Sequence, residues 1–281
     1  MSLRLRLMTP DDIPVGMHLK DLAQWNQTVA DWERFLALSP DGCFAAECDG
    51  RVVGTSTAIV YEGRFGWIGM VIVDPGYRGQ GIGRALLERA IQYVESQRIP
   101  VAKLDATPQG RPLYQTLGFV DEYAIERWVL HRPSLGRRQA QQQPSEIAVD
   151  VLQLDREVFG ADRGALLRSL AESAPELALV ERRGGMVVGY AFGRRGSLAD
   201  HLGPWVARDE RAAARLLGEF LERTGRDLVF VDAVTQNPWG LPLVTKCGFQ
   251  FSRPLTRMVR GSNNYPGRPT LQCAVLGPEF G

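Results

Sequence analysis

The sequence contains few of the residues that form metal sites and disulfide frameworks. Its 281 residues include 3 histidines and 4 cysteines. His18, His131 and His201 lie far apart and the cysteines form no CxxC pair, so no metal-ligand spacing is present and we expect no metal site. In a chain of this size the cysteines are typical of reduced thiols in a cytoplasmic protein. They are Cys43, Cys48, Cys247 and Cys273.

An excess of one charge and long apolar runs are missing as well. The formal net charge is +1, so no global electrostatic attraction to nucleic acid or to an acidic membrane is expected. No apolar run approaches the roughly 20 residues that a membrane helix needs. The first ten residues alternate arginine with leucine and do not resemble a signal peptide. We therefore expect a cytoplasmic protein with neither a nucleic-acid nor a membrane partner.

What remains is an ordinary globular composition, with 44 % hydrophobic and 23 % charged residues. The length suits two domains of roughly 130–140 residues each. Residues 133–146 read PSLGRRQAQQQPSE, a polar segment without apolar periodicity that is typical of a linker. The sequence therefore predicts domains at 1–132 and 147–281, joined by a linker at 133–146.

The first half alternates between strand and helix patterns. Period-two alternation or continuous apolar runs predict strands at 3–7, 43–47, 52–60, 67–73, 101–106 and 119–130. Asp49-Gly50 predicts a hairpin turn. Helical periodicity covers 15–38, with a break near 25–27, and then 82–97 and 113–117. This order predicts a mixed α/β (α+β) domain built on one sheet.

The second half repeats the first in sequence. The segment from Thr107 to Phe119 aligns with the segment from Asn237 to Phe249, with Pro, Gly, Pro, Leu, Gly and Phe at matching places. GRVVG at 50–54 likewise matches GMVVG at 185–189. Several matches in the same order predict an internal repeat, although two unrelated α/β domains can share such patterns by chance.

One segment of the first half has no counterpart in the second. Between a buried strand and a helix, residues 76–83 read GYRGQGIG, whereas the second half has only DERAAA at 209–214. Glycines let a loop adopt unusual backbone angles and turn consecutive N–H groups inward, and a helix N-terminus adds the positive end of its dipole. Arg78 and Arg84 could add charge-assisted hydrogen bonds. This loop therefore suits a diphosphate.

Other phosphate-binding motifs fit the loop less well. A dinucleotide-binding fold needs G-x-G-x-x-G and an acidic residue after the next strand, for which Asp105 is the sole candidate. A P-loop needs G-K-[ST], which is absent.

The segment Val71–Leu87 resembles the central motif of the GNAT (GCN5-related N-acetyltransferase) superfamily. Arg78, Gly81 and Gly83 match its [Q/R]-x-x-G-x-[G/A] pattern, and LYQTLGF at 113–119 resembles the family's "LY…GF" segment. The resemblance covers roughly residues 3–131, and the second half is similar to a degenerate GNAT repeat. It implies a tandem of two GNAT-like domains, each with a mixed, mostly antiparallel sheet flanked by helices.

The resemblance also implies a site for acetyl-CoA as co-substrate. The strand before the loop would bind the pantetheine arm through its backbone, and the loop amides would bind the diphosphate. Tyr114 would be the general acid that protonates the departing thiolate, whereas Val244 stands at the matching place in the second half. The expected cofactor-binding residues are Val71, Ile72, Val73, Arg78, Gly79, Gln80, Gly81, Ile82, Gly83 and Arg84.

The base and the acceptor site are less defined. Glu47, Glu62, Asp105 or a chain of waters could take the proton of the amine. In this family the first two helices shape the acceptor site, which here points to Trp25, Asn26 and Gln27, with Tyr61 and Trp67 as further candidates. Trp25 as a core residue and Asn26 as a helix cap are the alternatives.

The leading interpretation is an N-acetyltransferase that acetylates a primary amine of a small molecule by direct attack. A protein N-terminal or lysine acetyltransferase and a non-catalytic acyl-CoA sensor are the alternatives. The second domain is expected to close one side of the acceptor cleft or to form a pseudo-dimer, and the chain is expected to be a monomer or a homodimer.

Overall fold

The computed structural model describes residues 2–132 and 146–281, which form two compact units. Unit 1 comprises Met1–Asp121, Met258–Asn263 and Phe280, and unit 2 comprises Glu122–Arg257, Asn264–Glu279 and Gly281. Each unit therefore includes a segment from the other half of the sequence. The expected linker lies outside the described residues except for Glu146, and the domain boundaries stay a prediction.

Unit 1 is built on a mixed, mostly antiparallel sheet. Its strand order is β1 (Leu3–Leu7), β2 (Cys43–Cys48), β3 (Arg51–Tyr61), β4 (Phe65–Val73), β5 (Ala102–Ala106) and then the end of β11 (Gln250–Arg260). The first four strands are antiparallel, and β5 runs parallel to β4. Asp49 and Gly50 both have positive φ, 47° and 81°, which confirms the predicted hairpin turn.

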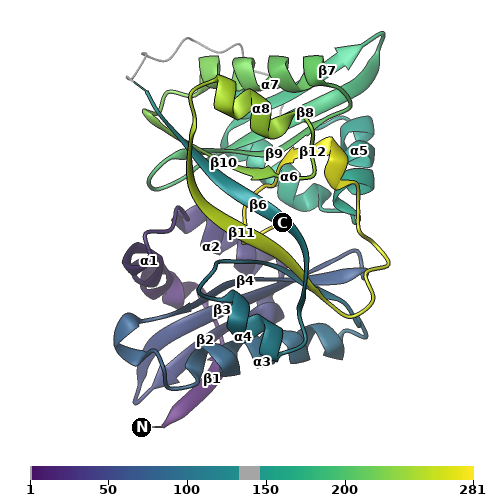
Figure 1. The fold of residues 1–281 in the computed structure, drawn as a ribbon. Coiled ribbons are helices and arrows are strands. Elements are labelled where there is room, and N and C mark those ends of the chain that lie inside the picture. The colour runs from purple at the N-terminus through teal and green to yellow at the C-terminus, as the bar shows by residue number, and fades with distance from the viewer. Residues whose placement is uncertain (1, 133–145) are drawn as a thin grey trace. The chain divides into compact units, whose positions relative to one another are not determined.

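Helices cover both faces of this sheet. In Figure 1, α1 (Ile13–Leu22) and α2 (Val29–Leu38) lie on one face, and α3 (Ile82–Ser96) lies on the other. The apolar residues that recur along α3 (Ile82, Leu86, Ala90 and Val94) are buried, and the helix packs against β2–β4. Gly66 makes room for it, because a Cβ there would lie 2.2 Å from Val94. The short helix α4 (Arg111–Thr116) ends before Gly118, whose φ of 85° is typical of the glycine that follows a helix C-terminus.

Unit 2 repeats this architecture. Its strand order is β11, β6 (Val120–His131), β10 (Leu228–Val234), β12 (Gln272–Ala274), β9 (Asp200–Ala207), β8 (Met186–Arg195) and β7 (Ala178–Arg183). The helix α7 (Glu210–Arg223) packs on β7, β8 and β9, while α5 (Val149–Phe159) and α6 (Gly164–Ser173) pack on β8. The helix α8 (Gly240–Lys246) follows β10, as α4 follows β5 in unit 1.

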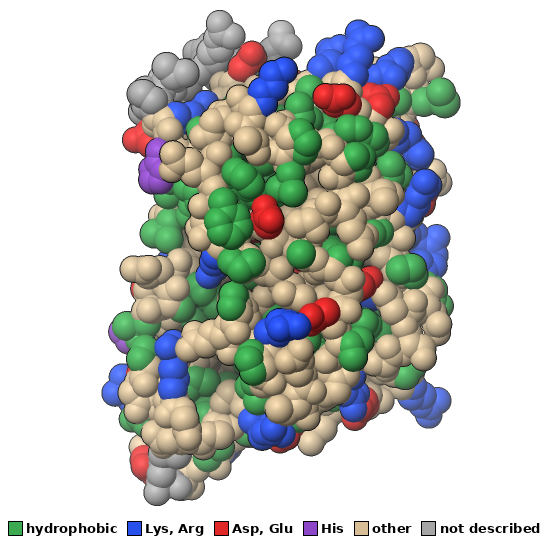
Figure 2. Space-filling model, viewed as in Figure 1, with side chains coloured by type: hydrophobic (Ala, Val, Ile, Leu, Met, Phe, Trp, Pro, Cys, Tyr) green, Lys and Arg blue, Asp and Glu red, His purple; other side chains and the backbone are tan. Residues whose placement is uncertain are grey.

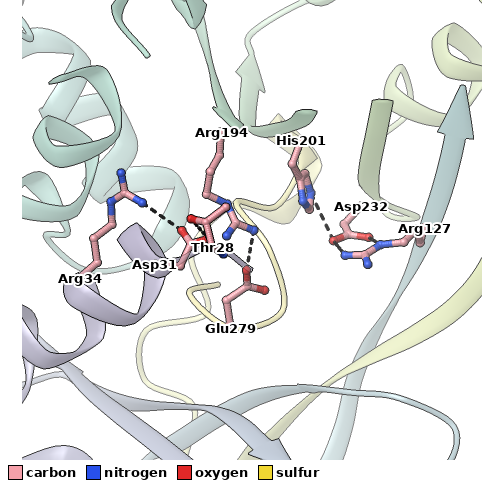
Figure 3. A network of polar contacts seen from close by, with 8 residues as sticks. All are labelled: Thr28, Asp31, Arg34, Arg127, Arg194, His201, Asp232 and Glu279. Atoms are coloured by element: carbon pink, nitrogen blue, oxygen red, sulfur yellow. Dashed lines mark hydrogen bonds and ion pairs between the residues drawn. The ribbon is translucent and has the colours of Figure 1, made fainter. Parts of the chain in front are cut away.

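Charged groups are also buried inside unit 2. Arg127 on β6 donates to both carboxylate oxygens of Asp232 on β10, at 2.7 and 2.6 Å (Figure 3). Nε2 of His201 on β9 lies 3.3 Å from the same carboxylate. Arg127 holds the pKa of Asp232 far below its usual range despite burial, and burial lowers the pKa of His201. Because both pKa values are lowered in the folded state, each group contributes its full stability near neutral pH and less at lower pH. The contribution of His201 is lost as the pH falls below about 6.5, and that of Asp232 as the pH falls below about 4.

This buried pair makes a testable contrast with an exposed arginine–aspartate pair that also has two hydrogen bonds. Arg127→Met should lower the free energy of unfolding of unit 2 by about 3–5 kcal/mol, because it leaves Asp232 charged and buried. Arg182→Met removes the exposed pair with Asp150, at 2.6 and 2.8 Å, and should change stability little. Urea denaturation of both variants checks this, and equal losses would contradict it.

The surface carries both signs of charge. On the face drawn in Figure 2, basic and acidic side chains are interspersed among apolar ones. None of the helices within residues 2–132 and 146–281 combines the length and the apolar character that a membrane crossing requires.

Candidate active site

The middle of β4 is distorted by a bulge. Thr55 pairs with Ile72 and Thr57 with Gly69, so a single residue of β3 faces both Met70 and Val71. Met70 has a φ of +50°, and its carbonyl accepts a hydrogen bond from Oγ1 of Thr55 at 3.0 Å. A bulge bends the strand and removes a backbone group from the ladder. The local structure therefore turns backbone groups of β4 away from regular sheet pairing.

The bulge coincides with an opening between β4 and β5. Within the described residues these parallel strands pair at Gly66–Ala102 and Trp67–Lys103, and their ladder ends there, although β4 continues to Val73. The edge of β4 beyond Trp67, which pairs with no residue of β5, includes Val71, Ile72 and Val73, the strand residues expected to bind the pantetheine arm. An unpaired strand edge offers N–H and C=O groups to an extended amide-bearing ligand.

The glycine loop begins where β4 ends. Asp74 caps a short turn at Pro75–Tyr77 by accepting from the N–H of Gly76 at 2.9 Å. Gly79 and Gly81 then have φ of +75° and +81°, backbone angles that residues other than glycine rarely adopt. Gly81 is the N-cap of α3, so the first-turn N–H groups of a 15-residue helix lie at this loop.

The expected unusual backbone angles occur at two of the three glycines and not at the third. A Cβ at Gly79 or Gly81 would meet nothing within 4 Å, so the protein itself leaves room there and the constraint is the backbone angle. Gly83 has neither constraint, because its φ is ordinary and a Cβ would lie 3.7 Å from Val73. The exposed loop thus combines two glycines at positive φ with the N–H groups of a helix N-terminus, and this combination suits an anion.

The two loop arginines are partly engaged in the described structure. Nε of Arg78 donates to the carbonyl of Val73 at 3.1 Å, which places this side chain along the end of β4. Arg84 contacts Glu88 at 3.2 Å and donates to Oγ1 of Thr116 at 2.7 Å, which links α3 to α4. Gln80 and Ile82 complete the loop, with Gln80 exposed and Ile82 buried in the core.

Tyr114 lies on α4, with its hydroxyl beside the first turn of the helix. A Cβ at Gly110 would approach the Tyr114 hydroxyl to 2.9 Å, and the ring packs at 6.3 Å from the ring of Phe119. Burial raises the pKa of Tyr114 to about 12. The phenol therefore keeps its proton at neutral pH, which suits a proton donor and not a base.

The three candidate bases occupy different environments. Glu47 on β2 accepts from Nε of Arg6 at 3.0 Å, so it belongs to a structural ion pair. Glu62 lies in the β3–β4 turn, 3.4 Å from Arg64. Asp105 lies two residues beyond the last β4–β5 pair, level with Gly69 and next to the bulge. Of the three, the strand register brings Asp105 nearest to the opening.

The acceptor candidates lie between α1 and α2. The backbone N–H of Trp25 bonds to the carbonyl of Lys20 at 2.9 Å, and Trp25 is half-buried while Asn26 and Gln27 are buried. The alternative of Asn26 as a helix cap is wrong, since Thr28 is the N-cap of α2 and Asp31 completes its capping box. Among the residues that the structure describes, Oε1 of Gln27 is buried without a hydrogen-bond partner.

The sequence did not point to an aromatic cluster on the same face of unit 1. Phe280 stacks on Phe35 of α2 with ring centroids 4.4 Å apart, and its carbonyl accepts from the hydroxyl of Tyr61 at 2.9 Å. Tyr61 thus uses its hydroxyl within this cluster, and Trp67 is buried in β4. The sequence feature that could have indicated this cluster is the segment after β11, which has no counterpart in the first half.

Comparisons with known proteins identify the class. The chain matches the model of the acetyltransferase (GNAT) family at residues 15–119 and that of an acetyltransferase (GNAT) domain at residues 151–272. The chain therefore belongs to the GNAT superfamily as a tandem of two such domains, and it is an acyl-CoA-dependent N-acetyltransferase by this membership.

Three similar proteins align with this chain over most of its length. Holothin acyltransferase of Pseudoalteromonas sp. (strain SANK 73390) is 24 % identical over 92 % of this chain and 87 % of its own length. A crystal structure of a putative acetyltransferase from Pyrococcus horikoshii superposes with a TM-score of 0.84 at 24 % identity, covering 99 % of this chain and 96 % of that one. A tandem GNAT protein from the clavulanic acid biosynthesis pathway superposes with a TM-score of 0.62 at 16 % identity, covering 92 % and 98 %.

Proposed function

We propose that unit 1 transfers an acetyl group from acetyl-CoA to a primary amine of a small molecule by direct attack. The observation that carries the proposal is the opening of the β4–β5 ladder directly before the Gly79–Arg84 loop. Strand edge and loop together offer an amide-lined path that ends at a helix N-terminus. An extended arm with a diphosphate at one end matches that path.

Different residues of unit 1 bind the cofactor, stabilise the transition state and transfer the proton. The N–H groups of Gly79–Arg84 bind the diphosphate, and the edge of Val71–Val73 aligns the pantetheine arm. A backbone N–H at the bulge, near Val71, stabilises the negative charge on the thioester oxygen as the amine attacks. The C–N bond forms, the C–S bond breaks, and Tyr114 donates its proton to the sulfur. The nitrogen of the adduct loses its extra proton to a carboxylate or to water before the amide is released, and the Tyr114 phenolate regains a proton from water.

The acceptor is recognised, in this proposal, by Trp25, Asn26 and Gln27. A buried carbonyl oxygen without a partner costs free energy until a donor reaches it, and an amine or amide of the acceptor supplies one. Gln27→Leu should therefore raise KM for the acceptor about tenfold and leave the affinity for acetyl-CoA unchanged. Steady-state kinetics and calorimetry check this, and an unchanged acceptor KM would remove Gln27 from the site.

A small-molecule acceptor is favoured by the relatives. One similar protein over nearly the whole chain is named for holothin and not for a protein substrate. The test is a screen of small amines, amino acids and lysine-containing peptides for thiol release from acetyl-CoA. Turnover with a small amine supports the proposal, turnover with peptides alone favours a protein acetyltransferase, and binding without turnover favours a sensor.

A further inference from the structure

In unit 2 the opening of the sheet is filled by the chain itself. The parallel strands β9 and β10 pair at Asp200–Val229, His201–Phe230 and Leu202–Val231. Beyond these pairs β12 enters between them. It pairs with β9 at Gln272–Val206 and Ala274–Trp205, and with β10 at Ala233–Ala274. The N–H of Val275 then bonds to the carbonyl of Asp232 at 3.0 Å.

The filled opening corresponds to the open one in unit 1. Gly189 pairs with Ala207 as Gly54 pairs with Val73, and each ladder then shifts register, one residue further along β8 than along β3. Trp205 and Val206 therefore match Val71 and Ile72, the residues assigned to the pantetheine arm. The backbone of β12 binds the same strand positions in unit 2 that the arm would bind in unit 1.

The walls of the filled opening are adapted to β12. A Cβ at Gly203 would lie 1.9 Å from the carbonyl oxygen of Val275, and a Cβ at Gly240 would lie 2.8 Å from that of Cys273. Gly240 matches Gly110, beside which the Tyr114 hydroxyl lies in unit 1. The space taken by that hydroxyl in unit 1 is therefore taken by β12 in unit 2. The smaller Val244 at the matching position is buried and fits this exchange.

The diphosphate end is occupied as well. Two residues separate β9 from α7, and the second, Asp209, is the N-cap of α7. Oδ1 of Asp209 accepts from the N–H of Ala212 at 2.9 Å, and Arg183 lies 2.9 Å from the same carboxylate. An acidic side chain of the protein thus takes the place of an anion at this helix N-terminus.

We propose that unit 2 is a self-occupied cofactor site, in which residues 272–275 replace the pantetheine arm and Asp209 replaces the diphosphate. The segment acts as a tethered ligand that stays in place during catalysis. The chain therefore binds a single acyl-CoA, in unit 1. This inference rests on the proposed function of unit 1, because that function defines what the opening accepts.

The cysteines provide a direct readout on the full-length chain. Cys273 is buried in β12, Cys43 and Cys48 are buried in unit 1, and Cys247 is exposed. With a thiol-reactive probe and mass spectrometry, Cys247 should react fast and Cys273 slowly, with or without saturating acetyl-CoA. Calorimetry should give one equivalent of acetyl-CoA per chain.

Each contrary result has a distinct meaning. Two equivalents, or faster labelling of Cys273 when acetyl-CoA is added, would overturn the inference while the function of unit 1 stands. No binding at all would overturn the proposed function and, with it, the assignment of the second opening.

A variant pair tests the fit of β12. Gly203→Ala should speed labelling of Cys273 by on the order of tenfold, since the added methyl collides with Val275. Gly218→Ala is the control in the same unit, because a Cβ there meets nothing within 4 Å, and it should leave the rate unchanged. Unchanged labelling in a folded Gly203→Ala variant would contradict the fit, and if that variant does not fold, the wild-type labelling and stoichiometry decide.

Discussion

Gly81→Val is expected to weaken acetyl-CoA binding by at least about a hundredfold while unit 1 stays folded. A β-branched residue disfavours the φ of +81° that Gly81 adopts at the start of α3. The loop would change its path, and the N–H groups of the first helical turn would no longer converge on one anion. Losing two hydrogen bonds to a charged group, at about 1.5–3 kcal/mol each, gives this magnitude.

A matched control separates this effect from general backbone strain. Gly50, in the β2–β3 turn, has the same φ of +81°, and a Cβ there also meets nothing within 4 Å. Gly50→Val should therefore cost comparable stability and leave the affinity unchanged. Calorimetry with acetyl-CoA and thermal unfolding of both variants provide the comparison. Equal affinities in the two variants would show that the loop does not bind the cofactor.

Tyr114→Phe should lower kcat by about a hundredfold or more and change acetyl-CoA affinity by less than about threefold. General acid catalysis typically contributes a factor of about 10²–10⁴, and phenylalanine keeps the ring packing against Phe119 while it removes the proton. Tyr93→Phe is the control, because its hydroxyl lies 3.2 Å from Oγ of Ser39 in the core and has no proposed role in catalysis. That variant should keep a near-normal kcat.

The pH dependence gives a second readout for Tyr114. Burial raises the pKa of Tyr114 from 10 to about 12. The rate should therefore decrease near pH 12, where Tyr114 ionises and can no longer donate a proton. The raised pKa also adds to the free energy of unfolding, in full below pH 10. This addition is lost as the pH rises through the pKa of the folded state. Equal kcat values for wild type and Tyr114→Phe would remove the proposed role.

Local patterns in the sequence were sufficient to predict most elements of unit 1. The apolar run that became β4, the periodicity of α3 and the Asp49-Gly50 turn all reflect interactions between near neighbours in sequence. The GNAT motif placed the loop for the same reason, because a strand, a glycine turn and a helix N-terminus are contiguous. The roles assigned to these residues stay predictions until a ligand is bound.

Other features depend on contacts between distant parts of the chain. The bulge at Met70 follows from the pairing of β3 with β4, and the end of the β4–β5 ladder follows from the pairing of strands whose partners, such as Gly66 and Ala102, are far apart in sequence. No short motif encodes either feature. The inclusion of β6 in unit 2 and of the end of β11 in unit 1, and the insertion of β12, involve even longer separations. The short apolar segment at 272–276 does not reveal which strands it separates. Its position after the end of the repeat was the sole hint.

The structure of the protein with coenzyme A tests the central claim most directly. Density is expected for the diphosphate against the N–H groups of Gly79–Arg84 and for the pantetheine arm along Val71–Val73, with β12 still between β9 and β10. Coenzyme A bound in unit 2, or an empty loop in unit 1 at saturating ligand, would contradict it.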